Sequence, residues 1–315
     1  MPASFRRVHA IEGHYINDHC FIEADGCMHL FYILGEVGKG CYTPGNEVII
    51  GHSTSSDLET WTVEAHALVA DSRLAHESGH IFAPFVIEAA GGMARVGSRP
   101  LGSRPLSPEG DRLPAGRYWM FYSSDNEAGA QFINLAVSDD LFTWVRHPAN
   151  PILTPPDWAV WDPTIPCSCR DVHVVSHPEL GYLLYFVADL PRTPTESCIA
   201  VAQSRDLLSW SRAAPVLSRR HSTFERFVCK TESPCVVVRN GLYYLFYRHG
   251  NGTKLSVSTT PLSWHGCDSH LLGPIHAAEV FEFRGSWYAT SCSRPLEDLA
   301  HRHDRTDGLY LGSLV

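Results

Sequence analysis

A chain of 315 residues with 44% hydrophobic residues and a net charge of −9 has the composition of a globular protein that can bury a large core. The acidic balance argues against a nucleic-acid surface, and no apolar run reaches the roughly 20 residues of a membrane-spanning helix. We therefore expect neither nucleic acid nor a membrane as a partner. The ten cysteines include no Cys-x-x-Cys pair, which predicts free thiols, no structural zinc site and a cytoplasmic location.

Short strands recur along the chain in a fixed order. A glycine precedes an aromatic-rich strand five times, first in DGCMHLFYI at 25–33 and last in RGSWYATSC at 284–292. A short apolar strand stands before each of these, and an alternating strand follows the first four. The alternating strand leads into a turn of the form Asp-Leu-x-x-Trp, as in SSDLETW, which occurs at 55–61, 138–144, 204–210 and, in shortened form, 259–264.

Four antiparallel strands repeated along a chain are typical of propeller blades. The sequence therefore predicts an all-β fold, a five-bladed β-propeller with four-stranded antiparallel blades, as a single domain over 1–315. The last copy ends without a fourth strand, so we expect SFRRVHAI at 4–11 to complete it. The segment 91–116, which contains GSRPL twice, is expected to be a mobile insertion in blade two. We expect the tryptophans of the repeated turn to pack between blades rather than to bind a ligand.

The starts of the first strands should meet at one end of the central channel, because the first strand of each blade lines it. Counting back eight to ten residues from the repeat glycines gives four positions that we expect to be equivalent. Three of them are carboxylic acids, Asp18, Asp171 and Glu232, and the fourth is His276. Two carboxylates across a small pocket can cleave a glycosidic bond, one as acid and the other as nucleophile or base. Solvated acids or structural ion pairs, such as Asp171 with Arg170, are the alternative interpretation.

These motifs resemble the five-bladed β-propeller glycoside hydrolases, namely the invertase/levanase (β-fructofuranosidase) family and the related arabinanase/β-xylosidase family. INDHCFIEADGCMHLFYI at 16–33 resembles the Asn-Asp-Pro opening of the invertases, and CRDVHVV at 169–175 resembles their Arg-Asp-Pro motif. ESPCVVV at 232–238 resembles the motif that carries the acid/base in both families. IFAPFVI at 81–87 is instead similar to the Trp-Ala-Pro element of the arabinanase/xylosidase family. The resemblance covers nearly the whole chain.

The resemblance implies a role for each acid. Asp18 would be the nucleophile of a retaining enzyme or the general base of an inverting one. Asp171 would stabilise the transition state and orient the substrate, and Glu232 would be the general acid. His276 matches a histidine of the channel in xylosidase-type enzymes. The residues expected to bind substrate are Asn17, His19, Phe82, Arg170 and His276.

The expected function is hydrolysis of a furanoside, a small pentoside or a fructoside, with retaining β-fructofuranosidase-like chemistry preferred. An inverting α-L-arabinofuranosidase or β-xylosidase is the alternative within the class. A non-hydrolytic sugar-binding propeller and a tailoring enzyme acting on something other than a glycoside are the alternatives outside it. His19 and Val172 stand where the families have proline, and Phe82 stands where they have tryptophan, so substrate specificity does not carry over. We expect a small carbohydrate as partner and no cofactor or metal, with an axial Ca²⁺ or water-bridged ion as the alternative.

Overall fold

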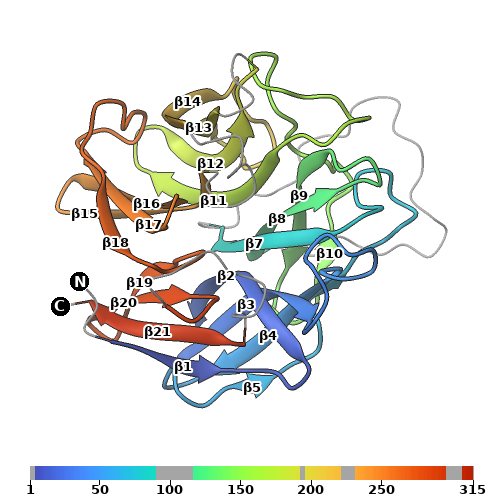
Figure 1. Cartoon of the computed structure of the whole chain (residues 1–315), viewed down its shortest axis with the longest axis vertical. Coiled ribbons are helices and arrows are strands. Elements are labelled where there is room, and N and C mark those ends of the chain that lie inside the picture. Colours follow the sequence, from blue (N-terminus) through green and yellow to red (C-terminus); the bar gives the residue numbers. More distant parts are fainter. Residues whose placement is uncertain (1–3, 90–115, 192–195, 221–230, 296–306, 315) are drawn as a thin grey trace.

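Five antiparallel sheets form a ring in the computed structural model (Figure 1). The structure describes residues 4–89, 116–191, 196–220, 231–295 and 307–314, and the regular elements in these ranges are all strands. Four sheets have four strands, and the sheet of blade one has a short fifth strand. The predicted all-β, five-bladed propeller is confirmed.

The first strand of a blade lies nearest the axis, and the strands that follow it lie progressively outward (Figure 1). Blade one contains β2 (His14–Ala24), β3 (Cys27–Glu36), β4 (Ile49–Ser55), β5 (Thr62–Val63) and β6 (Leu68–Val69). Blade two contains β7 (Ile81–Glu88), β8 (Tyr118–Asp125), β9 (Gln131–Ser138) and β10 (Val145–Arg146). Blade three contains β11 (Cys169–His177), β12 (Gly181–Asp189), β13 (Glu196–Ser204) and β14 (Ala214–Arg220). Blade four contains β15 (Glu232–Arg239), β16 (Leu242–His249), β17 (Gly252–Ser258) and β18 (His270–Gly273).

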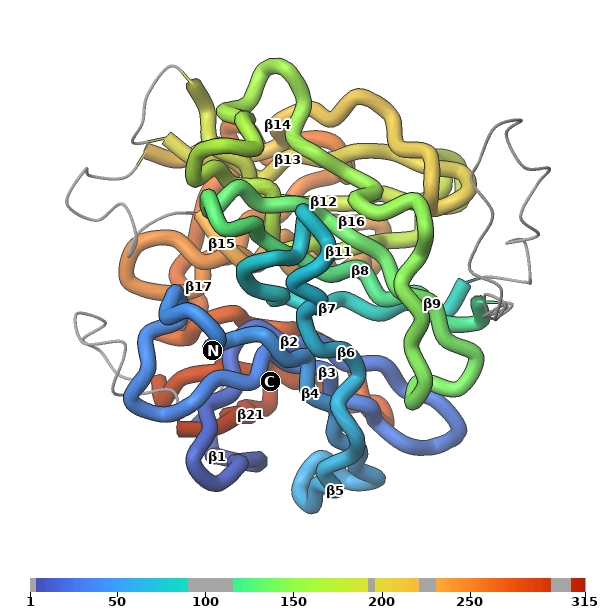
Figure 2. Tube along the Cα trace, turned by 90° about the vertical axis from the view of Figure 1, so that its right-hand side faces the viewer, coloured from blue at the N-terminus to red at the C-terminus, as the bar shows by residue number. Residues whose placement is uncertain are grey.

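Blade five is completed by the N-terminal strand. It contains β19 (Val280–Phe283), β20 (Ser286–Ser291) and β21 (Leu309–Leu314), with β1 (Phe5–His9) as its outermost strand. β1 pairs with β21 in antiparallel register, from Phe5 opposite Gly312 to His9 opposite Leu309. Both views of the chain place β1 beside β21 (Figures 1 and 2). The expected closure is confirmed, and it joins the two ends of the chain within one sheet.

Two-residue turns connect the first and second strands in several blades. In blade four, Asn240 and Gly241 have φ values of 52° and 74°, and Arg239 and Leu242 are paired on either side of them. Positive φ at both central residues is typical of a type I′ hairpin turn, where glycine is favoured because it has no Cβ. This turn fixes the register of β15 on β16.

The tryptophans of the repeated turn pack against the preceding blade, as predicted. The Trp144 ring of blade two lies edge-on to Phe31 of blade one, with ring centroids 5.5 Å apart. The Trp264 ring of blade four lies edge-on to Tyr185 of blade three, with centroids 5.8 Å apart. Trp210 belongs to the apolar cluster between blades two and three, and Trp61 to the one between blades five and one. A tryptophan in the same place of four repeats therefore joins neighbouring sheets.

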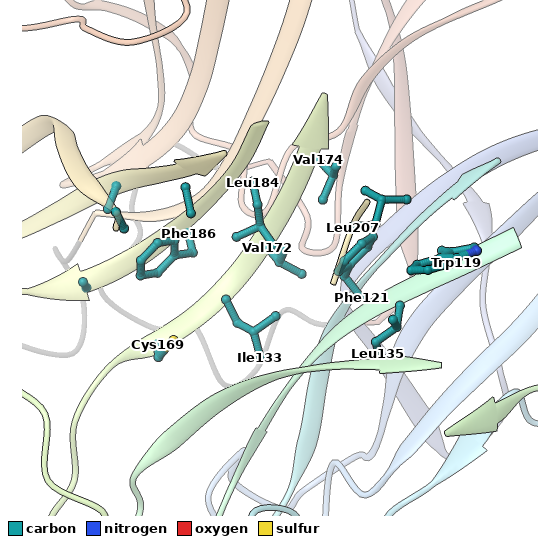
Figure 3. Close-up of a cluster of buried hydrophobic side chains, with 14 of the residues drawn as sticks. Trp119, Phe121, Ile133, Leu135, Cys169, Val172, Val174, Leu184, Phe186 and Leu207 are labelled. Carbon is teal, nitrogen blue, oxygen red and sulfur yellow. The ribbon is translucent and has the colours of Figure 1, made fainter. Parts of the chain in front are cut away.

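The largest apolar cluster lies between blades two and three (Figure 3). Phe121 on β8 and Phe186 on β12 are fully buried in it, together with Val172 on the innermost strand of blade three. Burial of such rings is the main term that favours folding. Because the cluster reaches the innermost strand, it also holds that strand in place beside the channel.

Trp264→Ala is expected to lower the free energy of unfolding by about 3–5 kcal/mol, the usual cost of truncating a large buried aromatic side chain. Trp264 is fully buried, whereas Trp61 is half-buried, so Trp61→Ala should cost less. Chemical denaturation of both variants measures the difference. Unchanged stability with weakened sugar binding in Trp264→Ala would contradict the packing role.

The predicted insertion at 91–116 lies outside the described residues, apart from Gly116. Its two flanking strands belong to one sheet, because β7 pairs with β8 from Ile81 opposite Ser124 to Glu88 opposite Tyr118. The extent of the domain over 1–315 stays a prediction.

Two further observations concern the described part of the chain. Its nine cysteines are all free thiols. No helix in the described residues has the length and apolar character that crossing a bilayer would require.

Candidate active site

A bulge interrupts the innermost strand of four blades next to the channel. The pairing register shifts between Ile16 and His19, between Phe82 and Phe85, between Arg170 and His173, and between Glu232 and Cys235. In blades two to four the backbone is left-handed at this point, with φ values of 46° at Ala83, 56° at Asp171 and 49° at Ser233. A bulge bends its strand and re-aims the neighbouring side chains, and bulges are frequent beside active sites.

The three predicted acids lie at different positions around this bulge. Glu232 is the last paired residue before it, Asp171 is its first residue, and Asp18 is its second. The expectation that they occupy equivalent positions is therefore wrong. Simple counting from the glycine fails because the hairpins differ in length: the last pair before the turn is Ala24–Cys27 in blade one, His177–Gly181 in blade three and Arg239–Leu242 in blade four.

Ser233 nevertheless connects the acids at the axis. Its Oγ donates a hydrogen bond to Asp18 Oδ1 at 2.8 Å, and its backbone N–H donates to Asp171 Oδ2 at 3.0 Å. Asp18 and Asp171 also line one axial cavity of about 20 Å³ to which all five blades contribute. The structure thus brings Asp18, Asp171 and the neighbour of Glu232 to a shared centre.

Two buried arginines hold Glu232. Arg248 Nη1 lies 2.6 Å from Glu232 Oε2, and Arg170 Nη2 lies 3.0 Å from Glu232 Oε1. Arg170 also reaches Asp171, with Nε 3.4 Å from Oδ1. The side chain of Arg248 is 1% exposed and that of Glu232 is 17% exposed. Charge-assisted pairs of this kind fix the orientation of both partners.

This arrangement separates the pKa values of the acids. Burial raises the pKa of Asp18, against the hydrogen bond from Ser233. Burial also raises the pKa of Asp171 to about 7, although Arg170 opposes the shift. Burial acts on Glu232 as well, but Arg248 and Arg170 outweigh it and leave the pKa of Glu232 below its ordinary value. Clustered titratable groups with divided pKa values are typical of active sites.

A larger cavity of about 600 Å³ opens next to Glu232 and Arg170. Its remaining polar wall comes mostly from loops and strand ends of blades one to three, namely Tyr42, Asp125, Gln131, Ser168 and Asp189. Asp18 and Asp171 do not line this cavity. Of the three predicted acids, Glu232 is therefore the one that faces this larger cavity, whose volume suits a substrate of more than one sugar unit.

The predicted substrate-binding residues have different surroundings. Asn17 Nδ2 donates to Glu47 Oε1 at 3.1 Å. Both ring nitrogens of His19 are occupied, Nε2 by Thr290 Oγ1 at 2.7 Å and Nδ1 by the Asn17 carbonyl oxygen at 3.2 Å.

The other two predicted contacts lie on blades two and five. Phe82 is buried beside Ile33 and Ala83. Burial lowers the pKa of His276 to about 4, and its Nδ1 has no hydrogen-bond partner within the described part of the chain.

Sequence reasoning missed Arg248, Ser233 and Glu47. Arg248 is paired directly opposite Glu232 across the β15–β16 hairpin, so counting outward from the Asn240–Gly241 turn would have found it. Glu47 is buried in blade one, where Tyr15 Oη donates to Glu47 Oε1 at 2.8 Å. Burial raises the pKa of Glu47 to about 7. No motif marks Glu47, because its place depends on how the loop after β3 folds back.

The family model for the glycosyl hydrolases family 32 N-terminal domain matches residues 10–234, a segment that includes Asp18, Asp171 and Glu232. The chain belongs to this family. This family 32 chain is therefore a glycoside hydrolase, as predicted. A sequence search of the curated proteins found no match.

Solved structures resemble this family 32 chain in fold at low identity. Fructan 1-exohydrolase IIa from Cichorium intybus is 18% identical with a TM-score of 0.64, over 99% of this chain and 57% of that one. The β-fructofuranosidase from Schwanniomyces occidentalis complexed with fructosyl-erythritol is 14% identical with a TM-score of 0.65, over 95% of this chain and 56% of that one. The GH43_1 enzyme from Xanthomonas citri complexed with xylose is 15% identical with a TM-score of 0.67, over 99% of this chain and 90% of that one. The chain thus spans little more than half the length of these two fructosidases.

Proposed function

We propose that this chain hydrolyses a small furanoside, with a β-fructofuranoside as the preferred substrate, and retains the configuration at the anomeric carbon. Membership of family 32 supports a fructoside, and two of the similar structures are named for activity on fructans or fructofuranosides. An inverting arabinofuranosidase or xylosidase is the second candidate, which the similarity to a family 43 enzyme complexed with xylose favours.

The observation that carries the proposal is the division of the acids between two cavities. Asp18 and Asp171 line the axial cavity, whereas Glu232 lines the larger one. A sugar ring seated over Asp18 and Asp171 directs its leaving group towards Glu232. The two carboxylates then stand on either side of the bond that breaks, as glycoside hydrolysis requires.

The roles follow from this division. Glu232 donates its proton to the leaving-group oxygen while the Asp18 carboxylate attacks the anomeric carbon and forms a glycosyl ester. The Glu232 carboxylate next accepts a proton from water, whose oxygen attacks the same carbon and releases Asp18. Ser233 orients Asp18 throughout, because its hydroxyl donates to the nucleophile. Asp171, paired with Arg170, accepts hydrogen bonds from sugar hydroxyls.

A substrate panel tests the function. Sucrose and short fructans are expected to be cleaved, and addition of methanol is expected to give methyl β-fructofuranoside, because a glycosyl ester can be transferred to an alcohol with retention. Nitrophenyl α-L-arabinofuranoside and β-D-xylopyranoside should be poor substrates. Product analysis by NMR measures both results.

Asp18→Asn is expected to lose turnover on every substrate, because the amide cannot form the ester. Asp25→Asn is the matched control, since Asp25 lies in the exposed turn after β2. Cleavage of the arabinoside or xyloside alone, or inverted product, would replace this proposal with the second candidate. Absence of turnover across the panel would refute both.

A further inference from the structure

A second group of polar side chains meets inside the propeller, beside the catalytic acids. It consists of His173 on β11, Cys235 on β15 and Glu279, which directly precedes β19. One nitrogen, sulfur or oxygen atom from each side chain lies within 4.8 Å of the others. The three residues come from blades three, four and five, so only the closed ring brings them together.

His173 has an unused ring nitrogen in this group. The residue is 6% exposed. Its Nε2 lies 3.2 Å from the Val236 carbonyl oxygen, whereas Nδ1 has no hydrogen-bond partner among the described residues. A carbonyl oxygen only accepts, so Nε2 carries the proton and Nδ1 keeps its lone pair. Metal-binding histidines commonly donate their other N–H to a backbone carbonyl in this way.

Cys235 and Glu279 also have the surroundings of metal ligands. The backbone N–H of Val280 donates to Cys235 Sγ at 3.4 Å, and Sγ also lies 3.9 Å from the Val280 carbonyl oxygen, so two backbone contacts fix the position of the sulfur. The groups that act on the Glu279 carboxyl are the Cys235 thiol and the Asp18 carboxyl, neither of which is a cation. A buried carboxylate without a cation is costly unless it is paired or binds a metal.

We propose that His173, Cys235 and Glu279 bind Zn²⁺ inside the propeller channel. Thiolate, imidazole and carboxylate are the donors that zinc prefers, whereas Ca²⁺ and Mg²⁺ prefer oxygen alone. The axial cavity of about 20 Å³, which Glu279 lines, has room for one water as the fourth ligand. Tetrahedral zinc holds its ligand atoms roughly 3–4 Å apart, so a small inward movement closes the site. Zinc here ties together the inner strands of three blades.

Metal content and cobalt absorption test the site. Full-length protein produced with added zinc is expected to keep one zinc per chain after dialysis and to unfold at a higher temperature than protein treated with a chelator. Co²⁺ in place of zinc should produce a thiolate-to-cobalt charge-transfer band in the near ultraviolet. Cys235→Ser is expected to remove this band and to weaken zinc binding at least about tenfold.

Two variants keep the test decisive. Cys169→Ser is the matched control, because Cys169 is a buried cysteine on the same strand as His173, with its Sγ 3.9 Å from the Leu153 carbonyl oxygen. It should keep both the band and the zinc. Glu279→Gln should weaken zinc binding while keeping the thiolate band. A chain that holds no zinc and shows no band, a Cys169→Ser variant that loses both, or stabilisation by Ca²⁺ but not Zn²⁺ would each overturn the proposal.

Discussion

Glu232→Gln is expected to reduce kcat/KM for sucrose by about 10²–10⁴-fold, the usual contribution of a general acid. The physical reason is that the sugar leaving group departs as an alkoxide unless it receives a proton. A nitrophenolate is stable without a proton, so cleavage of a nitrophenyl β-D-fructofuranoside should fall far less in the same variant. Steady-state kinetics on both substrates measures the two losses.

The ratio of the two losses identifies the role of Glu232. Asp18→Asn should reduce both reactions by similar factors, because the nucleophile acts on the sugar and not on the leaving group. Glu282→Gln is the control, since Glu282 is an exposed carboxyl on β19. Equal losses on sucrose and on the nitrophenyl substrate in Glu232→Gln would mean that Glu232 does not protonate the leaving group.

The fold could be predicted because the repeats contain turn motifs that can be recognised in the sequence. The turn at Ser55, Asp57 and Leu58 illustrates this point: Ser55 Oγ accepts from the Leu58 N–H at 2.9 Å, and Asp57 accepts from two backbone N–H groups. Leu58 has a φ of 64° there. Such local bonds depend on neighbouring residues alone, so a sequence motif encodes them completely. The pairing of β1 with β21 was predictable for a different reason, since an incomplete last repeat leaves one strand edge to fill.

The identity of the three acids of the site could be predicted, but not their positions relative to one another. Motifs identified Asp18, Asp171 and Glu232, and radial symmetry indicated that they meet. The three acids occupy three successive positions around the same bulge, and no period in the sequence reveals where the bulge lies. The left-handed φ at Ser233 belongs to that same bulge, so the residue that joins two of the acids looked like an ordinary polar side chain.

The cavity wall and the buried cluster could not be predicted from the sequence. Tyr42, Asp125 and Asp189 line the larger cavity from segments far apart in the chain, and loops carry no periodic signal. His173 and Cys235 likewise approach each other only because the inner strands of two blades lie side by side. A search for metal motifs at short spacing therefore passes over them.

The two arginines that pair with Glu232 oppose its proposed role as the general acid. A general acid has to be protonated before it can act, yet Arg248 and Arg170 lower the pKa of Glu232. Asp18 must be ionised at the same time, and burial raises its pKa. When the acid has the lower pKa and the nucleophile the higher one, the fraction of enzyme with Glu232 protonated and Asp18 ionised is constant between the two pKa values. Glu232 then controls the acidic limb of the pH profile and Asp18 the basic limb. The charged or titratable groups that interact with Glu232 in the structure are Arg248, Arg170, His276, Asp18, Asp171, Tyr42 and Cys41.

Arg248→Met is expected to raise the pKa of Glu232 and so to move the acidic limb of the kcat/KM profile to higher pH, because a cation at this distance lowers a carboxyl pKa by about one to three units. Arg248→Lys keeps the charge and should move the limb much less, and Arg248→Gln provides a second neutral variant if the methionine variant does not fold. The pH dependence of sucrose cleavage, with folding checked by denaturation at each pH, measures the shift. Because Arg170 remains at 3.0 Å from Glu232, the pKa of Glu232 should rise without losing all of its cationic support. An acidic limb that stays in place in both neutral variants would mean that a group other than Glu232 controls it, and the assignment of the general acid would then be wrong.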